Sequence, residues 1–167
     1  MWVSVSRRLS EYPERLRVAR VLVENGLSVK KGRIFCNNIE IPPVRIARAA
    51  DVDRRTVAQT VKAIQEDKEI CAIFEHLKNA GHSLKDVAKH LNMGVVEITP
   101  IDAKTPGILA KSASLLASRK ISIRQAIVDD PELSPEPKLT LLTEQKIPGE
   151  LFPEFLNISG VGKVTIY

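Results

Sequence analysis

The side chains with the clearest binding chemistry in this sequence are Arg54, Arg55 and Gln59, within the run ADVDRRTVAQTV. A guanidinium can donate two hydrogen bonds to guanine O6 and N7, and a glutamine amide can bind adenine N6 and N7. Asp53 can accept backbone N–H bonds as the N-cap of a helix that starts here, and these side chains would lie at its exposed start. These side chains would recognise a ligand through hydrogen bonds, and they would not catalyse a reaction.

No set of residues in the sequence has the spacing of a catalytic or metal site. The three histidines have no carboxylate or cysteine pattern around them, and the two cysteines lack metal or redox spacing. The pair Asp129-Asp130 stands before Pro131 at the end of a strand-like run, which is typical of a turn. We therefore expect a protein that is not an enzyme and that holds no metal and no cofactor.

The element that must present the arginines is a helix-turn-helix over Ile46 to Val61. Ile46 and Ala50 supply the inner face of a first helix, and Val57 and Val61 supply that of a second. This spacing resembles the helix-turn-helix of bacterial and archaeal transcription regulators, in which the form Ala-x-x-x-Gly-Val-Ser-x-x-Thr-Val recurs.

Two positions depart from that form. Asp51 stands where a glycine usually takes the left-handed conformation, which aspartate tolerates better than most residues. Thr60 stands where an apolar residue is common, and Val61 can cover it. The resemblance implies that the second helix contacts double-stranded DNA, with Thr56 against a phosphate. The predicted DNA-binding residues are Arg54, Arg55, Thr56, Ala58, Gln59 and Lys62. The alternative is a helical hairpin used for dimerisation or subunit contact.

The charge distribution favours DNA binding over a helical hairpin used only for dimerisation or subunit contact. Residues 1–92 carry 17 Lys and Arg against 11 Asp and Glu, a net charge of +6, whereas residues 93–167 carry 8 against 9, a net charge of −1. An excess of cations in one half is expected if that half meets a polyanion. The alternative is a solvated basic surface. The same two interpretations apply to Lys30, Lys31 and Arg33. They could contact phosphate, but such a run is more often a solvated turn.

The remaining N-terminal elements are expected to be short. Ser10 is predicted to cap a helix that Pro13 enters and that ends before Gly26. Residues 27–41 are predicted to form extended pieces with turns at Lys31-Gly32 and Asn37-Asn38.

Composition limits the class of protein. The chain has 167 residues, of which 44% are hydrophobic, so it can bury a core in one domain or in two small ones. Two unrelated cysteines indicate reduced thiols, and no apolar run is long enough to span a bilayer or to form the core of a signal peptide. We expect a soluble, cytoplasmic protein that does not contact a membrane.

The C-terminal half predicts a βαββαβ order, the split βαβ arrangement of ferredoxin-like folds. The predicted elements are a strand over Val95–Ile101, an amphipathic helix with Ile108, Leu109, Leu115 and Leu116 available for one face, strands over Ile121–Val128 and Leu139–Thr143, a helix over Gly149–Leu156 and a strand over Lys163–Tyr167. With Asp-x-x-x-Pro-Gly-Ile-Leu at the first strand-to-helix turn, this half resembles an ACT domain, a small module that binds amino acids.

The resemblance widens to most of the chain. The runs IPPVRIARAADVDRRTV, GHSLKDVAKHLNMGVVEI, PGILAKSASLLASRKISIRQAIVDDPEL and PGELFPEFLNISGVGKV are similar to predicted regulators of amino acid metabolism, which join a helix-turn-helix unit to one ACT domain. The fold class expected is α+β. The domains expected are a helix-turn-helix domain over 1–66, a helical linker over 67–92 and an ACT domain over 93–167. Within the linker we expect a helix through Leu77, a break, and a second helix capped by Ser83.

The resemblance to ACT domains also implies a ligand site. These domains usually pair through their sheets, and an effector commonly binds where the first strand-to-helix turn of one subunit faces the second strand of its partner. Helix-start N–H groups can hold a carboxylate, and Asp102 is the nearest acid for an ammonium, unless it caps an Asx turn. The predicted ligand-binding residues are Asp102, Thr105, Gly107, Ile108, Leu109, Ile123 and Arg124.

Two functions follow from these resemblances. The first is a homodimeric transcriptional regulator that binds double-stranded DNA and senses an amino acid effector. The alternative is a regulatory subunit that docks on an amino acid biosynthetic enzyme for feedback control, because small subunits of acetolactate synthase also have an ACT domain with a similar turn. The segment Ile46–Val61 separates the two, since docking does not require it.

Overall fold

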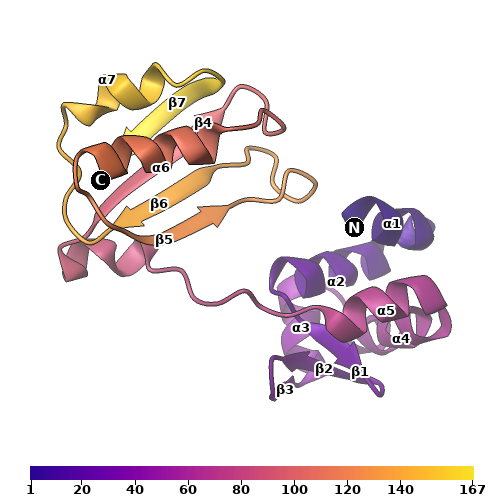
Figure 1. The fold of residues 1–167 in the computed structure, drawn as a ribbon. Helices are drawn as coiled ribbons and strands as arrows, with labels where there is room; N and C mark the ends of the chain where they lie inside the picture. The colour runs from indigo at the N-terminus through magenta and orange to yellow at the C-terminus, as the bar shows by residue number, and fades with distance from the viewer. The chain divides into compact units, whose positions relative to one another are not determined.

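The computed structural model describes residues 1–167, which divide into two compact units, Met1–Gly81 and His82–Tyr167 (Figure 1). The predicted α+β class is confirmed: unit 1 is mostly helical, and unit 2 is built on a four-stranded antiparallel sheet. No helix in the structure is long and apolar enough to cross a bilayer.

Unit 1 combines five helices with a three-stranded antiparallel sheet. Its elements are α1 (Trp2–Leu9), α2 (Pro13–Glu24), β1 (Ser28–Lys30), β2 (Arg33–Cys36), β3 (Ile39–Ile41), α3 (Pro43–Ala50), α4 (Arg54–Glu66) and α5 (Lys68–His76). The extended pieces predicted over 27–41 are therefore three paired strands. Lys31, Gly32 and Asn37 have positive φ angles in the two predicted turns, a conformation that glycine and asparagine adopt readily.

The start of the chain differs from the prediction. Residues 2–9 form a helix of their own, and Ser10 ends it with a hydrogen bond from its hydroxyl to the Arg7 carbonyl. The N-cap of α2 is Tyr12, without a side-chain cap, so the prediction that Ser10 caps this helix is wrong. The physical reason is that Pro13 takes the first helical position, so the N-cap is Tyr12 and Ser10 lies two residues too early to accept the N–H groups of the first turn.

The core of unit 1 lies where α2, α3 and α4 pack on one another. Val18, Ala19 and Leu22 of α2 are buried together with the inner faces of the other two helices. Helix α5 adds Ile70 and Phe74 to this unit and packs on α4 and β1. Asp67 separates α4 from α5, and its carboxylate accepts the N–H groups of the first turn of α5.

Unit 2 has the βαββαβ order that the sequence predicts, preceded by a short 3₁₀ helix. Its elements are η1 (Lys85–Leu91), β4 (Gly94–Pro100), α6 (Ile108–Ser118), β5 (Ile123–Val128), β6 (Leu139–Thr143), α7 (Leu151–Leu156) and β7 (Val161–Ile166). The strand order is β5-β6-β4-β7, and every neighbouring pair is antiparallel. This is the ferredoxin-like order, with the first and third strands of the unit in the centre.

The sheet of unit 2 carries different elements on its two faces. Helices α6 and α7 cover one face, over a core that includes Val96, Ile98 and Leu141 (Figure 1). On the other face η1 packs through Ala88 against Val95 and Leu142.

The units divide inside the segment 67–92, for which the sequence predicts a linker. Helix α5 packs within unit 1, whereas the Gln125 side chain binds the His82 carbonyl at 2.6 Å and the Leu84 N–H at 2.9 Å within unit 2. The second predicted helix is the 3₁₀ helix η1. The Ser83 hydroxyl accepts the Lys85 N–H at 3.3 Å, just before η1 begins.

Candidate nucleic-acid interface and effector turn

The turn between α3 and α4 has the backbone geometry of a sharp helix-to-helix connection. Asp51 is left-handed, with φ 51° and ψ 57°, and the Val52 N–H returns to the Ala47 carbonyl at 3.0 Å. Asp53 then caps α4, because its carboxylate accepts the Arg55 N–H at 2.7 Å. The conformation predicted for Asp51 and the cap predicted for Asp53 are both confirmed.

Packing fixes α4 with one face inward. Val57, Val61 and Ile64 are buried, and so is Thr60, whose hydroxyl donates to the Thr56 carbonyl at 2.7 Å. Because this hydroxyl is satisfied within the helix, the departure from an apolar residue at position 60 leaves no unpaired polar group in the core.

The opposite face of α4 presents most of the predicted DNA-binding residues to solvent. Arg54, Arg55, Ala58, Gln59 and Lys62 are exposed. Arg54 and Arg55 have no ion-pair partner within 4.0 Å, whereas Lys62 Nζ lies 3.7 Å from Glu66 Oε1. The two guanidinium groups are therefore free to meet a polyanion.

Two of the predicted residues also contact α2. The Thr56 hydroxyl donates to Glu14 Oε2 at 3.1 Å, and Arg15 donates to Gln59 Oε1 at 3.4 Å. A phosphate beside Thr56 would have to displace the first contact and would lie near the Glu14 carboxylate. Arg15, which the predicted set omits, adds a cation next to Gln59.

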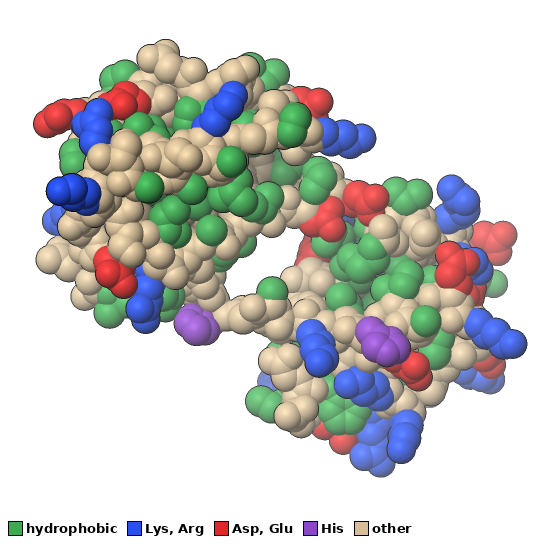
Figure 2. Space-filling model, in the orientation of Figure 1, with side chains coloured by type: hydrophobic (Ala, Val, Ile, Leu, Met, Phe, Trp, Pro, Cys, Tyr) green, Lys and Arg blue, Asp and Glu red, His purple; other side chains and the backbone are tan.

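The basic turn between β1 and β2 lies beside α4. A Cβ added at Gly32 would be 3.5 Å from Gln65 Oε1, so this turn borders the second half of the helix. Lys30, Lys31 and Arg33 line a hollow of about 520 Å³ here. In Figure 2, Lys and Arg side chains gather on the part of unit 1 that contains this sheet. Nothing in their spacing along the chain shows that they adjoin α4.

The turn after β4 is organised by Asp102. Its Oδ1 accepts the Lys104 N–H at 2.9 Å, and the Thr105 N–H binds the Asp102 carbonyl at 3.0 Å. This is the Asx turn that the sequence allows. Gly107, with φ 88°, is the N-cap of α6 and supplies no side chain, so the N–H groups that begin α6 have no side-chain cap.

A glycine that the predicted ligand site omits holds this turn in place. Gly160, with φ 92°, lies so close that an added Cβ would be 2.7 Å from Thr105 Cγ2 and 3.4 Å from Ile108 Cδ1. The Gly160 carbonyl also accepts the Ile101 N–H at 2.8 Å. Gly160 and Thr105 are about 55 residues apart in the sequence, so local sequence patterns do not reveal that they touch.

The predicted ligand residues fall into two places within one chain. Thr105, Gly107, Ile108 and Leu109 line a hollow of about 200 Å³ together with residues from the end of β5 and the start of β6. The sequence-based set does not contain Val128, Asp129 or Lys138, which also line this hollow. They lie at this end of the sheet because β5 ends and β6 begins there.

Ile123 and Arg124 lie at the other end of β5. Strands β4 and β5 both run antiparallel to β6, so they share a direction, and the start of β5 is far from the turn that follows β4. At about 3.3 Å per residue the six residues of β5 separate the two places by roughly 16 Å. A single site that contains both the turn before α6 and the start of β5 would therefore need these two parts from different chains.

The acidic pair at the end of β5 serves the backbone. Asp129 Oδ2 accepts the Lys138 N–H at 3.1 Å, and Asp130 Oδ1 accepts the Glu132 N–H at 2.8 Å. These bonds confirm the turn chemistry predicted for Asp129-Asp130. The structure contains no group of three or more His, Cys, Asp or Glu side chains placed to hold a metal ion.

The other face of the sheet carries a buried carboxylate. Glu97 of β4 accepts Lys85 Nζ at 2.7 Å and the Tyr167 hydroxyl at 2.8 Å. Burial raises the pKa of Glu97, but the two hydrogen bonds and the positive charges of Lys85 and Lys138 together outweigh it, so this pKa lies below its ordinary value. The same bonds raise the pKa of Lys85 and the pKa of Tyr167.

Comparison with known proteins gives a limited result. No family model and no curated protein matches the chain. The regulatory subunit of aspartate kinase from Thermus thermophilus is 20% identical over 46% of this chain and 51% of its own, with a TM-score of 0.32. This chain therefore matches about half the length of that subunit.

Two other solved structures cover more of the chain. AsnC of E. coli is 14% identical over 92% of this chain and 87% of its own, with a TM-score of 0.30. A transcriptional regulator of Neisseria meningitidis, in a complex with L-Met, is 14% identical over 92% and 86%, with a TM-score of 0.27. Scores below 0.5 mark a weak likeness, from which we infer nothing about this chain.

Proposed function

We propose that this protein is a transcriptional regulator that is not an enzyme, binds double-stranded DNA through α4, and responds to an amino acid bound at the α6 turn of a homodimer. The observation that carries the proposal is the exposed start of α4, where Arg54 and Arg55 have no ion-pair partner beside the left-handed turn at Asp51. A helix held by a sharp turn, with free guanidinium groups at its start, suits the major groove.

The charge of unit 1 supports the same proposal. Residues 1–81 carry 15 Lys and Arg against 10 Asp and Glu, whereas residues 82–167 carry 10 of each. Phosphate binding by the excess cations would supply affinity that does not depend on base sequence, and Arg54, Arg55 and Gln59 would supply the discrimination between sequences.

The proposed effector site rests on the turn before α6. The helix start offers uncapped N–H groups and the positive end of the helix dipole to a carboxylate. The second Asp102 oxygen remains for an ammonium, since the Lys104 N–H binds Oδ1. In the dimer, Ile123 and Arg124 of the other chain would close this site. An effector that favours one spacing of the two α4 helices would then change operator affinity.

The proposal of DNA binding is tested by selection from a library of randomised DNA duplexes, followed by fluorescence anisotropy on a selected duplex. We expect a Kd that weakens steeply, by about 10³-fold or more, between 50 and 200 mM salt if six or more phosphates are contacted. No enrichment of any sequence, with equal weak binding to every duplex, would contradict operator recognition. It would favour a subunit that docks on an enzyme.

The proposal of amino acid sensing is tested by thermal unfolding with each of the twenty amino acids. An effector at one hundred times its Kd stabilises the native state by about 2.7 kcal/mol. The variant Leu109→Lys places a long side chain at the α6 start and should abolish the shift. Leu156→Lys changes a similarly exposed leucine on α7 and should keep it. A shift that survives Leu109→Lys would place the effector elsewhere, and no shift with any amino acid would contradict sensing.

A further inference from the structure

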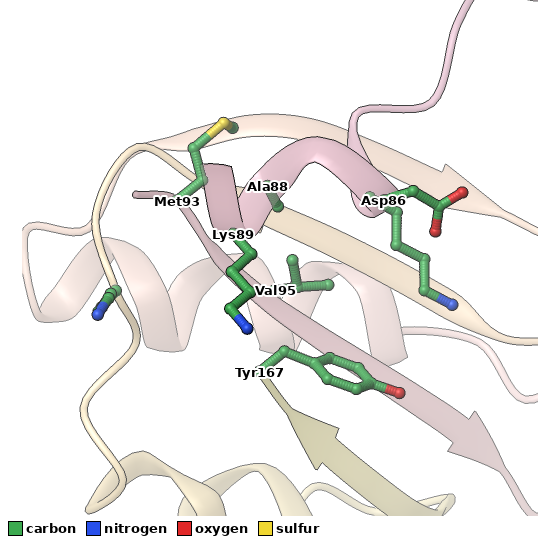
Figure 3. Close-up of a pocket in the computed structure, with 8 residues that line it drawn as sticks. Asp86, Ala88, Lys89, Met93, Val95 and Tyr167 are labelled. Carbon is green, nitrogen blue, oxygen red and sulfur yellow. The ribbon is translucent and has the colours of Figure 1, made fainter. Parts of the chain in front are cut away.

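A second pocket of unit 2 lies beneath η1, on the sheet face opposite to α6 and α7. Its volume is about 440 Å³, and it lies between the 3₁₀ helix, the start of β4 and the end of β7 (Figure 3). Ala88, Met93, Val95 and the Tyr167 ring line its apolar part, and Lys89 and Lys146 line its polar part. The volume is in the range of pockets that hold small organic molecules.

The charges around this pocket are mostly positive. Lys89 and Lys146 have no ion-pair partner within 4.0 Å, whereas Lys85 binds Glu97 at 2.7 Å. Asp86 is the one carboxylate in the lining, and Figure 3 shows it directed away from Lys89. Neither of these two ammonium groups is neutralised within the protein, so a bound anion could pair with them.

The apolar part of the pocket is partly rigid and partly adaptable. Ala88 and Val95 are buried and belong to the cluster that joins η1 to the sheet. The Tyr167 ring is held by its hydrogen bond to Glu97, and Figure 3 shows it beside Lys89 and Val95. Met93 is half-buried and unbranched, so it can adjust to ligands of different shape.

We propose that this pocket binds a small organic anion, with a carboxylate or phosphate group at Lys89 and Lys146 and an apolar body on Met93, Val95 and the Tyr167 ring. Binding here goes beyond the proposed function, because the pocket shares no residue with the α6 turn. It also needs neither DNA nor the second chain that the effector site requires.

Titration of the full-length protein with phenyl phosphate, followed by amide chemical shifts in NMR spectra, tests this proposal. Phenyl phosphate combines an anion with an apolar ring. We expect saturable shifts at Ala88, Lys89, Met93 and Val95. Phenol lacks the anion and inorganic phosphate lacks the ring, so each should bind at least about tenfold more weakly. Inorganic phosphate that binds as tightly as phenyl phosphate would overturn the proposal, because the site would then be an adventitious ion site only.

Charge-removing variants complete the test. Lys89→Gln with Lys146→Gln should weaken phenyl phosphate by about tenfold or more and leave the melting temperature almost unchanged, because neither lysine has an ion-pair partner. Lys104→Gln with Lys111→Gln removes the same charge from exposed positions outside the pocket and should not change the affinity. Equal losses in the two double variants would reveal attraction by net charge alone and would overturn the proposal.

Discussion

Arg17 Nη2 on α2 lies 3.1 Å from the carbonyl oxygen of Asp51, the left-handed residue that follows α3. Arg17 Nε also donates to the Ala50 carbonyl at 3.2 Å. One guanidinium therefore satisfies two carbonyl groups at the C-terminal end of α3, where a cation also interacts favourably with the helix dipole. Through this contact α2 fixes the turn that positions α4.

Replacement of Arg17 should therefore affect DNA binding without removing a DNA contact. We expect Arg17→Ala to lower the free energy of unfolding by about 1 kcal/mol and to weaken binding to the selected duplex. Urea denaturation and anisotropy measure the two effects. Arg7→Ala removes an exposed arginine of α1 from the same unit and serves as control. Equal losses in both variants would show that Arg17 acts through net charge and has no special role in the turn.

The close approach of Gly160 to Thr105 predicts a specific loss of stability. Gly160→Ala requires a left-handed alanine and a Cβ within 2.7 Å of Thr105 Cγ2, so it should destabilise unit 2 by about 2–3 kcal/mol. Gly107→Ala shares the positive φ, but its Cβ would meet only Lys111 Cε, at 3.9 Å, and it should cost about 1 kcal/mol. Gly149→Ala has neither problem. Thermal unfolding that ranks these three variants equally would contradict the role of Gly160.

The bonds around Glu97 predict how the stability of unit 2 depends on pH. The pKa of Glu97 is lowered on folding, so its contribution is present above the unfolded value of about 4.3 and is lost as the pH falls through the folded value. The pKa values of Lys85 and Tyr167 are raised, so their contributions are lost as the pH rises above about 10.

Glu97→Gln should flatten both limbs of this profile, which denaturation between pH 3 and pH 11 would reveal. Tyr167→Phe removes one hydrogen bond and keeps the bond to Lys85, so it should retain the acid limb and lose about 1 kcal/mol near pH 7. Glu150→Gln changes an exposed carboxylate just before α7 and is a control for the loss of one charge. If the loss of stability at low pH persists in Glu97→Gln, other carboxylates are responsible for it.

The exposed face of α4 predicts two kinds of loss on DNA. Arg54→Ala and Arg55→Ala should each cost about 1–3 kcal/mol on the selected duplex and relax the preference for one base pair. Lys62→Ala should weaken selected and unselected duplexes alike and reduce the salt slope by about one. Circular dichroism should show an unchanged fold, because all three side chains are exposed. Unchanged operator affinity in both arginine variants would contradict the assignment of α4.

The elements of both units follow largely from local patterns. Asp53 and the apolar spacing around Val57 predict α4, and an alternating run predicts β5. Helix α1 was not predicted, because a segment of eight residues has few turns from which a period can be recognised. The contacts of Arg17 with Asp51, of Gly160 with Thr105 and of Glu97 with Tyr167 join residues far apart in the chain, so no local spacing could reveal them.

The separation of Arg124 from the α6 turn predicts that one effector site needs two chains. Leu109→Lys alters the turn and Arg124→Glu alters the start of β5, so each variant alone should bind no effector. A dimer of one chain of each variant has two effector sites. One site combines the altered turn with the altered start of β5, and the other combines the intact turn with the intact start of β5. Mixing the purified variants, with time for subunit exchange, should therefore restore part of the binding measured by calorimetry with an amino acid that the thermal screen identifies.

Lys163→Glu makes the same change of charge at an exposed position on β7, the edge strand opposite to β5, and is the control for Arg124→Glu. If Arg124→Glu binds the effector normally and mixing adds nothing to Leu109→Lys, the ligand lies within one chain. The hollow between Thr105 and Val128 would then be the effector site, because Val128 ends β5 on the side of the turn. Restoration on mixing requires both chains, since neither variant chain contains two intact halves.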